Sequence, residues 1–124
     1  TAAMMLGGMG WAVGEGGLMM GTADGGQIWR LKAAGQTDVN LLGVEFLSRF
    51  TGYIIGENGA LFYTDDMGAN WVRQYNDCHE ADNDLFDILA LANLNSVWTV
   101  DSTGKVCKSV TSSNGEPWIT QYSV

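Results

Sequence analysis

Basic residues, histidine and proline are scarce in this chain of 124 residues. Six lysines and arginines stand against 14 aspartates and glutamates, a formal net charge of −8, and there is one histidine and one proline. The basic residues are scattered: Arg30, Lys32, Arg49, Arg73, Lys105 and Lys108. Because nucleic-acid binding needs clustered lysine and arginine to neutralise phosphates, we expect no nucleic-acid partner.

Long hydrophobic runs are also missing. No stretch approaches the roughly 20 apolar residues that a membrane-spanning helix needs, so we expect no membrane insertion. The opening TAAMMLGGMGWAV is apolar but lacks a basic leading segment, which argues against a signal peptide. The compartment stays open, with export or surface association as alternatives for a soluble protein.

Cysteine is limited to Cys78 and Cys107. Two cysteines form neither a disulfide framework nor a CxxC metal-binding knuckle. The favoured interpretation is two unrelated thiols, with a single disulfide as the alternative. Cys78 stands beside the single histidine, His79, but a transition metal there would need ligands from elsewhere. We therefore predict no metal and no cofactor.

Glycine and large aromatic residues, by contrast, are abundant. The chain has 17 glycines, five tryptophans and four tyrosines, and 46% of its residues are hydrophobic. This composition is typical of a folded domain in which aromatic strands alternate with tight turns. The length corresponds to one domain.

The sequence repeats itself at an offset of 42 residues. GWAVGEGG at 10–17 matches GYIIGENG at 52–59, and TADGGQIW at 22–29 matches TDDMGANW at 64–71. A looser third copy follows, with WTVDSTG on YIIGENG and TSSNGEPW in place of the turn. A period in the forties is typical of propellers and repeat arrays.

Each repeat resolves into four short strands. In the second copy we expect strands at 41–46, 51–56, 60–64 and 70–75, with Gly-Glu-Asn-Gly as a hairpin turn. Four antiparallel strands per repeat make one propeller blade. The predicted fold class is all-β, a single propeller segment over 1–124 with three four-stranded antiparallel blades at about 1–37, 38–82 and 83–124.

The turn T-x-D-x-G-x-x-W occurs in both clear copies, between the third and fourth strands. Its carboxylate can accept backbone N–H bonds, its glycine allows backbone angles that a β-carbon disfavours, and its tryptophan covers the blade. We interpret the turn as structural rather than as a ligand site. Its residues are Thr22, Asp24, Gly26 and Trp29 in the first copy and Thr64, Asp66, Gly68 and Trp71 in the second. In the third copy Ser113 or Asn114 stands in place of the aspartate.

These turns resemble the Asp-box of BNR (bacterial neuraminidase) repeat propellers. The preceding GWAVGEGG and GYIIGENG are similar to the repeats of photosystem II stability and assembly factors, and the resemblance covers nearly the whole chain. It implies a propeller of six or seven blades that serves assembly without catalysis. The family role also implies a basic patch against a protein segment, and such a patch is not evident in this sequence.

Three blades are fewer than the roughly four to eight of closed propellers, and they would leave two open edges. We expect a homo-oligomer, most simply a dimer that closes a six-bladed ring, because closed two-fold assembly is the commonest kind. The alternative is that the chain is a fragment or one piece of a larger assembly.

The hairpins opposite the Asp-box turns, together with the long loop at 74–86, predict an acidic rim that binds a protein partner. Its carboxylates are Glu15, Glu57, Asp101, Glu80, Asp82 and Asp84, and the loop also carries Asp77. Asp82-x-Asp84 resembles part of a calcium loop but lacks its fixed glycine and final glutamate, so an ordinary solvated loop is favoured.

The leading hypothesis for function is a non-catalytic interaction platform. Sialidases share the Asp-box but need an arginine cluster, and the three arginines here are expected at separate blade edges. A single histidine and the lack of a nucleophile motif also argue against an enzyme. The alternatives are a structural or adhesive component, of a virion or an extracellular surface, and a fragment of a sialidase-type glycan hydrolase.

Overall fold

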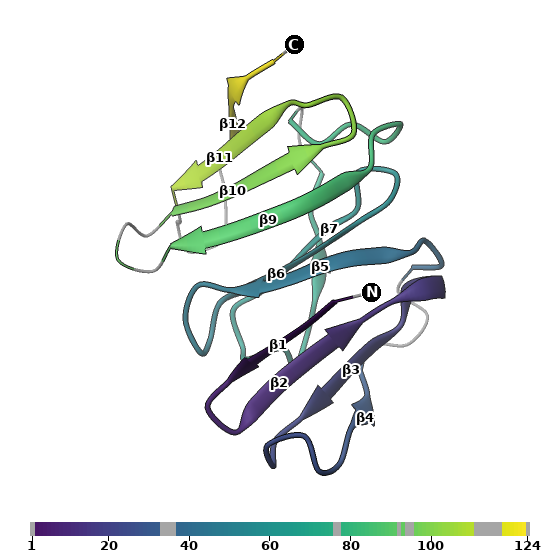
Figure 1. Ribbon diagram of the computed structural model, residues 1–124, viewed down its shortest axis with the longest axis vertical. Coiled ribbons are helices and arrows are strands. Elements are labelled where there is room, and N and C mark those ends of the chain that lie inside the picture. Colours follow the sequence, from purple (N-terminus) through teal and green to yellow (C-terminus); the bar gives the residue numbers. More distant parts are fainter. Residues whose placement is uncertain are drawn as a thin grey trace.

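A computed structural model of the chain describes residues 2–32, 37–75, 78–91, 93, 96–110 and 118–123. These residues form three antiparallel sheets of four strands each, in which every strand pairs with the next along the chain (Figure 1). The first sheet contains β1 (Ala2–Leu6), β2 (Met9–Val13), β3 (Met19–Thr22) and β4 (Arg30–Leu31), with a 3-10 turn η1 (Glu15–Gly17). The second contains β5 (Leu41–Phe46), β6 (Gly52–Gly56), β7 (Leu61–Thr64) and β8 (Val72–Arg73). The third contains β9 (Leu85–Leu91), β10 (Ser96–Asp101), β11 (Val106–Val110) and β12 (Trp118–Tyr122).

The sheets stack face to face in chain order, as the blades of a propeller do. The first strands of the sheets lie side by side, with β5 packed between β1 and β9 (Figure 1). The fourth strand of each sheet forms its outer edge. The predicted all-β fold of four-stranded antiparallel blades is confirmed.

The fourth strand of the second sheet is shorter than predicted. Residues 70–75 were expected to form one strand, but β8 covers only Val72–Arg73. The reason lies in the turn before it, where the Asn70 amide donates to the Asp66 carboxylate at 2.9 Å. An amide held by the turn cannot join the ladder of the sheet.

Aromatic rings fill the spaces between neighbouring blades. Between the first two blades, Trp11 stacks on Phe46 with ring centroids 3.8 Å apart, and Phe46 meets Trp71 edge-on at 5.8 Å. Tyr53 lies against Trp118 of the third blade at 5.8 Å. Such ring pairs contribute about 0.5–1.5 kcal/mol each beyond the area they bury.

The outward faces of the first and third blades carry exposed apolar side chains. Phe86 and Leu89 of β9 are 58% and 52% exposed, and Met5 of β1 and Leu31 of β4 are 46% and 59% exposed. In a closed propeller these faces pack against further blades. Closure of a six-bladed ring by a second copy stays a prediction, which light scattering on the isolated chain would test.

Candidate functional site

The two Asp-box turns have the same internal hydrogen bonds. In the second, the Thr64 hydroxyl donates to the Asp66 carboxylate at 2.7 Å and accepts from the Gly68 amide at 3.1 Å. In the first, the Thr22 hydroxyl donates to Asp24 at 2.8 Å, and that carboxylate accepts from the Ile28 amide at 2.9 Å. Both carboxylates are thus occupied by donors of their own turn.

These bonds favour the ionised carboxylates. The Ile28 amide, followed by the Thr22 hydroxyl, holds the pKa of Asp24 below its usual value. The Thr64 hydroxyl, followed by the Asn70 amide, does the same for Asp66. A lowered pKa is what donors to the charged form produce. The corresponding turn of the third repeat, at 111–117, lies outside the described residues.

The second turn also contacts the first blade. Gly68 has a φ of +84°. A β-carbon at this position would collide with the indole nitrogen of Trp11. Gly68 therefore allows both the left-handed backbone and the close approach of this turn to Trp11.

Replacing the buried hydroxyl of the second turn is expected to destabilise the protein. Thr64→Val keeps the shape of the side chain but leaves the buried Gly68 amide without its acceptor and removes one donor from the Asp66 carboxylate. The unpaired amide costs about 1–3 kcal/mol of unfolding free energy. Urea denaturation measures the difference. Thr22→Val is the matched variant in the first turn, where Thr22 is 6% exposed against 1% for Thr64, so we expect it to cost less. A Thr64→Val protein as stable as the parent would contradict the structural interpretation of the turn.

On the rim opposite the Asp-box turns, hydrogen bonds join each blade to the next. Asn40, between the first two blades, accepts from the Gly16 amide through its side chain at 3.0 Å, and its own amide donates to Glu57 at 3.2 Å. Asp84 occupies the equivalent place between the second and third blades. It accepts from the Asn58 amide at 3.0 Å.

The predicted rim carboxylates differ in burial and in the hydrogen bonds that they accept. Asp101 is 4% exposed and accepts from the Thr103 hydroxyl and the Lys105 amide. Burial opposes its ionisation, but these hydrogen bonds outweigh burial and lower the pKa of Asp101 below its ordinary value. Glu57 and Asp84 cap backbone amides, as described above. Glu15 and Asp82 are exposed, and within the described part of the chain their carboxylates have no hydrogen-bond or ion-pair partner.

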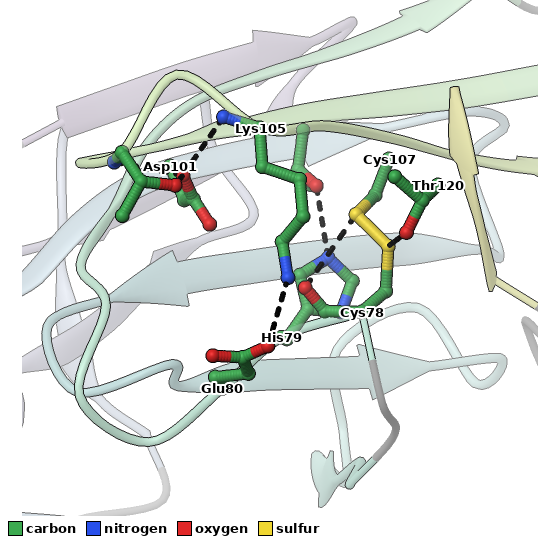
Figure 2. The surroundings of a disulfide bond; sticks show 9 residues. Cys78, His79, Glu80, Asp101, Lys105, Cys107 and Thr120 are labelled. Atoms are coloured by element: carbon green, nitrogen blue, oxygen red, sulfur yellow. Dashed lines mark hydrogen bonds and ion pairs between the residues drawn. A yellow bond between two sulfur atoms is a disulfide. The ribbon is translucent and has the colours of Figure 1, made fainter. Parts of the chain in front are cut away.

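Glu80 forms an ion pair with Lys105 at 3.3 Å, at a point where the lysine side chain is 10% exposed and the glutamate side chain 62% (Figure 2). Asp77 lies outside the described residues. Within the described part of the chain, no three His, Cys, Asp or Glu side chains are grouped closely enough to hold a metal ion.

A disulfide joins Cys78 to Cys107, so the expectation of two unrelated thiols is wrong (Figure 2). The loop after the second blade folds back on β11 of the third, which brings the two Cα atoms to 6.3 Å. The Thr120 hydroxyl donates to the Cys78 sulfur at 3.5 Å, and both cysteines are buried. Their 29-residue separation in sequence does not reveal this proximity.

His79 is buried beside the disulfide. Its Nε2 lies 2.8 Å from the Thr99 hydroxyl, and its ring meets Trp118 edge-on at 4.7 Å. Burial, followed by the nearby Lys105 charge, lowers the pKa of His79 to about 4. The imidazole is therefore neutral at physiological pH, where it serves packing and a hydrogen bond rather than charge.

One pair of carboxylates was missed in the sequence. Glu45 of β5 and Asp87 of β9 stand one 42-residue repeat apart, on neighbouring inner strands. Burial raises the pKa of Glu45, and the negative charge of Asp87 raises it further. The offset of the repeat was the signal that could have identified this pair.

The arginines do not form the cluster that a sialidase requires. Arg30 lies on β4, Arg73 on β8 and Arg49 in the turn after β5. Arg73 lies over the rings of Phe62 and Tyr75, at 5.5 and 5.0 Å. No helix within the described ranges has the length and hydrophobicity to cross a bilayer.

Comparison with known proteins identifies the family. A family profile described as "Photosynthesis system II assembly factor YCF48" matches residues 3–118. The chain belongs to this family. The photosystem II stability/assembly factor HCF136 of rice (Oryza sativa subsp. japonica) is 42% identical over 52 residues, which are 41% of this chain and 12% of that protein.

Two solved structures of the YCF48 family have the same fold. A YCF48 bound to a D1 peptide superposes with a TM-score of 0.75 at 26% identity, over 99% of this chain and 44% of that one. YCF48 from Cyanidioschyzon merolae gives a TM-score of 0.76 at 25% identity, over 95% of this chain and 35% of that one. The chain thus spans less than half the length of these relatives. The family profile and the rice relative are both described as photosystem II assembly factors.

Proposed function

We propose that this chain is a non-catalytic propeller segment that binds a polypeptide partner during the assembly of photosystem II. The observation that carries the proposal is the match of the YCF48 family profile to residues 3–118. The solved relative bound to a D1 peptide supports a protein segment as the ligand.

The acidic rim is the proposed contact surface for a basic segment of the partner. Its hairpins and linkers are held together by the hydrogen bonds of Asn40 and Asp84, so its backbone is organised before a partner arrives. Glu15 and Asp82 are exposed on it, and their carboxylates have no hydrogen-bond or ion-pair partner among the described residues. Preorganised surfaces bind more tightly because less conformational entropy is lost on association.

A peptide-binding experiment tests whether the chain binds a polypeptide and whether the acidic rim is the contact surface. We expect the chain to bind a D1 peptide or a basic ten-residue peptide in fluorescence anisotropy, with affinity that falls as salt increases. Glu15→Gln with Asp82→Asn should weaken the basic peptide about fivefold, since an exposed charge contributes up to about 1 kcal/mol. Asp65→Asn, an exposed carboxylate by the Asp-box turns, is the control.

If the unmodified chain binds the basic peptide and the Glu15→Gln, Asp82→Asn variant binds it equally well, the rim is not the contact surface. A failure of the unmodified chain to bind either peptide would contradict the wider proposal.

A further inference from the structure

One position of the third strand carries a ring in the second repeat and no side chain in the first. Tyr63 of β7 pairs with Tyr53 of β6, and their rings lie 5.3 Å apart. One repeat earlier, Trp11 of β2 pairs with Gly21 of β3 in the same register. Gly21 thus stands where the second blade has a tyrosine that is 7% exposed.

The missing ring leaves a hollow between the first and second blades. It has a volume of about 270 Å³, and residues of both Asp-box turns line it. This is slightly below the roughly 300–1,000 Å³ of pockets that hold drug-sized ligands, so it suits one large side chain with its polar neighbour. Its apolar lining is Met9, Trp11, Ile28 and Met67, and its polar lining includes Thr22, Asp24, Arg30 and Lys32.

The hollow has a local excess of positive charge on an acidic protein. Arg30 pairs with Gly21 across the strands, and the Lys32 side chain passes 3.1 Å from the place of a β-carbon on Gly21. Neither cation has an acidic partner among the described residues. Asp24 is the single carboxylate that lines the hollow, and its Oδ1 already accepts the Ile28 amide.

The second repeat lacks this basic pair. The positions 42 residues later are Val72 and Gln74, which carry no charge. The open space and the two cations therefore occur together in the first repeat, and both are missing from the second.

We propose that this hollow binds an acidic peptide segment of a partner protein. A bulky apolar side chain of the peptide takes the place that the Tyr63 ring fills in the next blade, against Trp11. A carboxylate beside it is held by Arg30 and Lys32, and a guanidinium can bind a carboxylate through two parallel hydrogen bonds.

Met67 supports a binding role for the hollow. It has a φ of +66°, where the first Asp-box turn has Gly25 with a φ of +74°. The left-handed conformation costs a residue with a β-carbon about 1–2 kcal/mol. Here it presents a flexible thioether to the hollow, a side chain suited to adaptable binding surfaces.

This site is separate from the acidic rim and needs no further blades. Its walls come from the first blade with its Asp-box turn and from Met67 of the second Asp-box turn, whereas Glu15 and Asp82 belong to the opposite rim. It also prefers a peptide of opposite charge. Rim variants should therefore leave it unchanged, so the two proposals can fail independently.

The test uses a fluorescein-labelled ten-residue peptide that contains phenylalanine and leucine among aspartates and glutamates, with anisotropy as the readout. Gly21→Tyr fills the hollow with the residue of the second repeat and removes no charged residue. Gly21 lies in β3 with no positive φ, and its nearest neighbours are flexible Lys32 atoms, so the tyrosine can be accommodated. We expect at least a tenfold loss of affinity.

Arg30→Gln with Lys32→Gln should produce a similar loss while the hollow stays open. Arg49→Gln with Lys108→Gln removes the same charge elsewhere and should change affinity less than twofold. A peptide with asparagine and glutamine in place of its acidic residues should bind at least tenfold more weakly, and so should one with alanine in place of its apolar residues.

Several results would overturn the proposal: no binding to the unmodified chain, full binding by Gly21→Tyr, or an equal loss in the Arg49 and Lys108 control. Circular dichroism checks the fold of each variant. If Gly21→Tyr fails to fold, Met67→Gly takes its place, because it removes the apolar wall and relieves a left-handed residue. Full affinity of the Met67→Gly protein would then count against the hollow.

Discussion

Replacement of Cys78 and Cys107 by serine is expected to lower the free energy of unfolding by about 3.5 kcal/mol. The disulfide closes a loop of 29 residues, and the entropy that such a loop removes from the unfolded chain corresponds to about this value. Small domains have about 5–15 kcal/mol of stability in total, so the loss is a large share of it. Urea denaturation of the oxidised protein and the double serine variant measures the difference.

The effect of a reductant on the parent and on the double serine variant provides a control. Reductant should destabilise the parent protein and leave the serine variant unchanged, because only the parent has a bond to reduce. Both cysteines are at most 4% exposed, so we expect reduction of the folded parent to be slow and to accelerate in urea. Equal urea midpoints for the oxidised parent and the serine variant would contradict a stabilising role for this bond.

The disulfide holds the loop between the second and third blades at the point where the blades meet. His79 and Glu80 follow Cys78 directly. The His79 imidazole contacts the Thr99 hydroxyl of the third blade, and Glu80 pairs with Lys105 of the same blade (Figure 2). Loss of the bond is therefore expected to loosen the acidic rim in addition to lowering global stability. This links the stability of the fold to the surface proposed for the partner.

The blades could be predicted from sequence because their signals are local. The Asp-box bonds run between residues no more than four apart, as in Thr64 to Gly68, so a short motif contains the whole arrangement. The hairpin at 56–59 is similar, because Asn58 and Gly59 both have the positive φ expected of such a turn. Strand length was less predictable, since the Asp66 carboxylate competes with the sheet for the Asn70 amide.

The contacts between blades could not be predicted in the same way. Cys78 and Cys107 meet because a loop folds across a neighbouring sheet, and neither residue lies in a motif that indicates its partner. The hollow beside Gly21 depends on which residue faces Trp11 across the strands, which requires the register. The sequence contained the Gly21-to-Tyr63 difference, but its meaning appears only once the two blades are packed together.

Acidification is expected to destabilise the protein through its single histidine. His79 is 6% exposed, and its pKa in the folded state is lowered to about 4 by burial, with a further contribution from Lys105 that Asp101 partly opposes. An unfolded histidine has a pKa of about 6.5. Between these values the unfolded chain binds a proton that the folded chain does not, so stability falls as pH falls.

The expected size of the effect follows from the two pKa values. Stability should be unaffected by His79 above about pH 7.5, should fall by about 2 kcal/mol by about pH 5, and should lose about 3 kcal/mol by about pH 4. Urea denaturation over this range measures the slope. Asp24, Asp66 and Asp101 have lowered pKa values, so their contribution is lost mainly at the acidic end of the range.

His79→Gln separates the histidine from these carboxylates. Glutamine can still hydrogen-bond to the Thr99 hydroxyl but does not titrate, so the variant should be nearly independent of pH between about 7.5 and 5. The stability of the parent relative to the variant should therefore fall by about 2 kcal/mol between about pH 7.5 and pH 5, whatever the substitution costs at neutral pH. Parallel curves would show that the buried imidazole does not control acid stability, and that the charge balance of the carboxylates does.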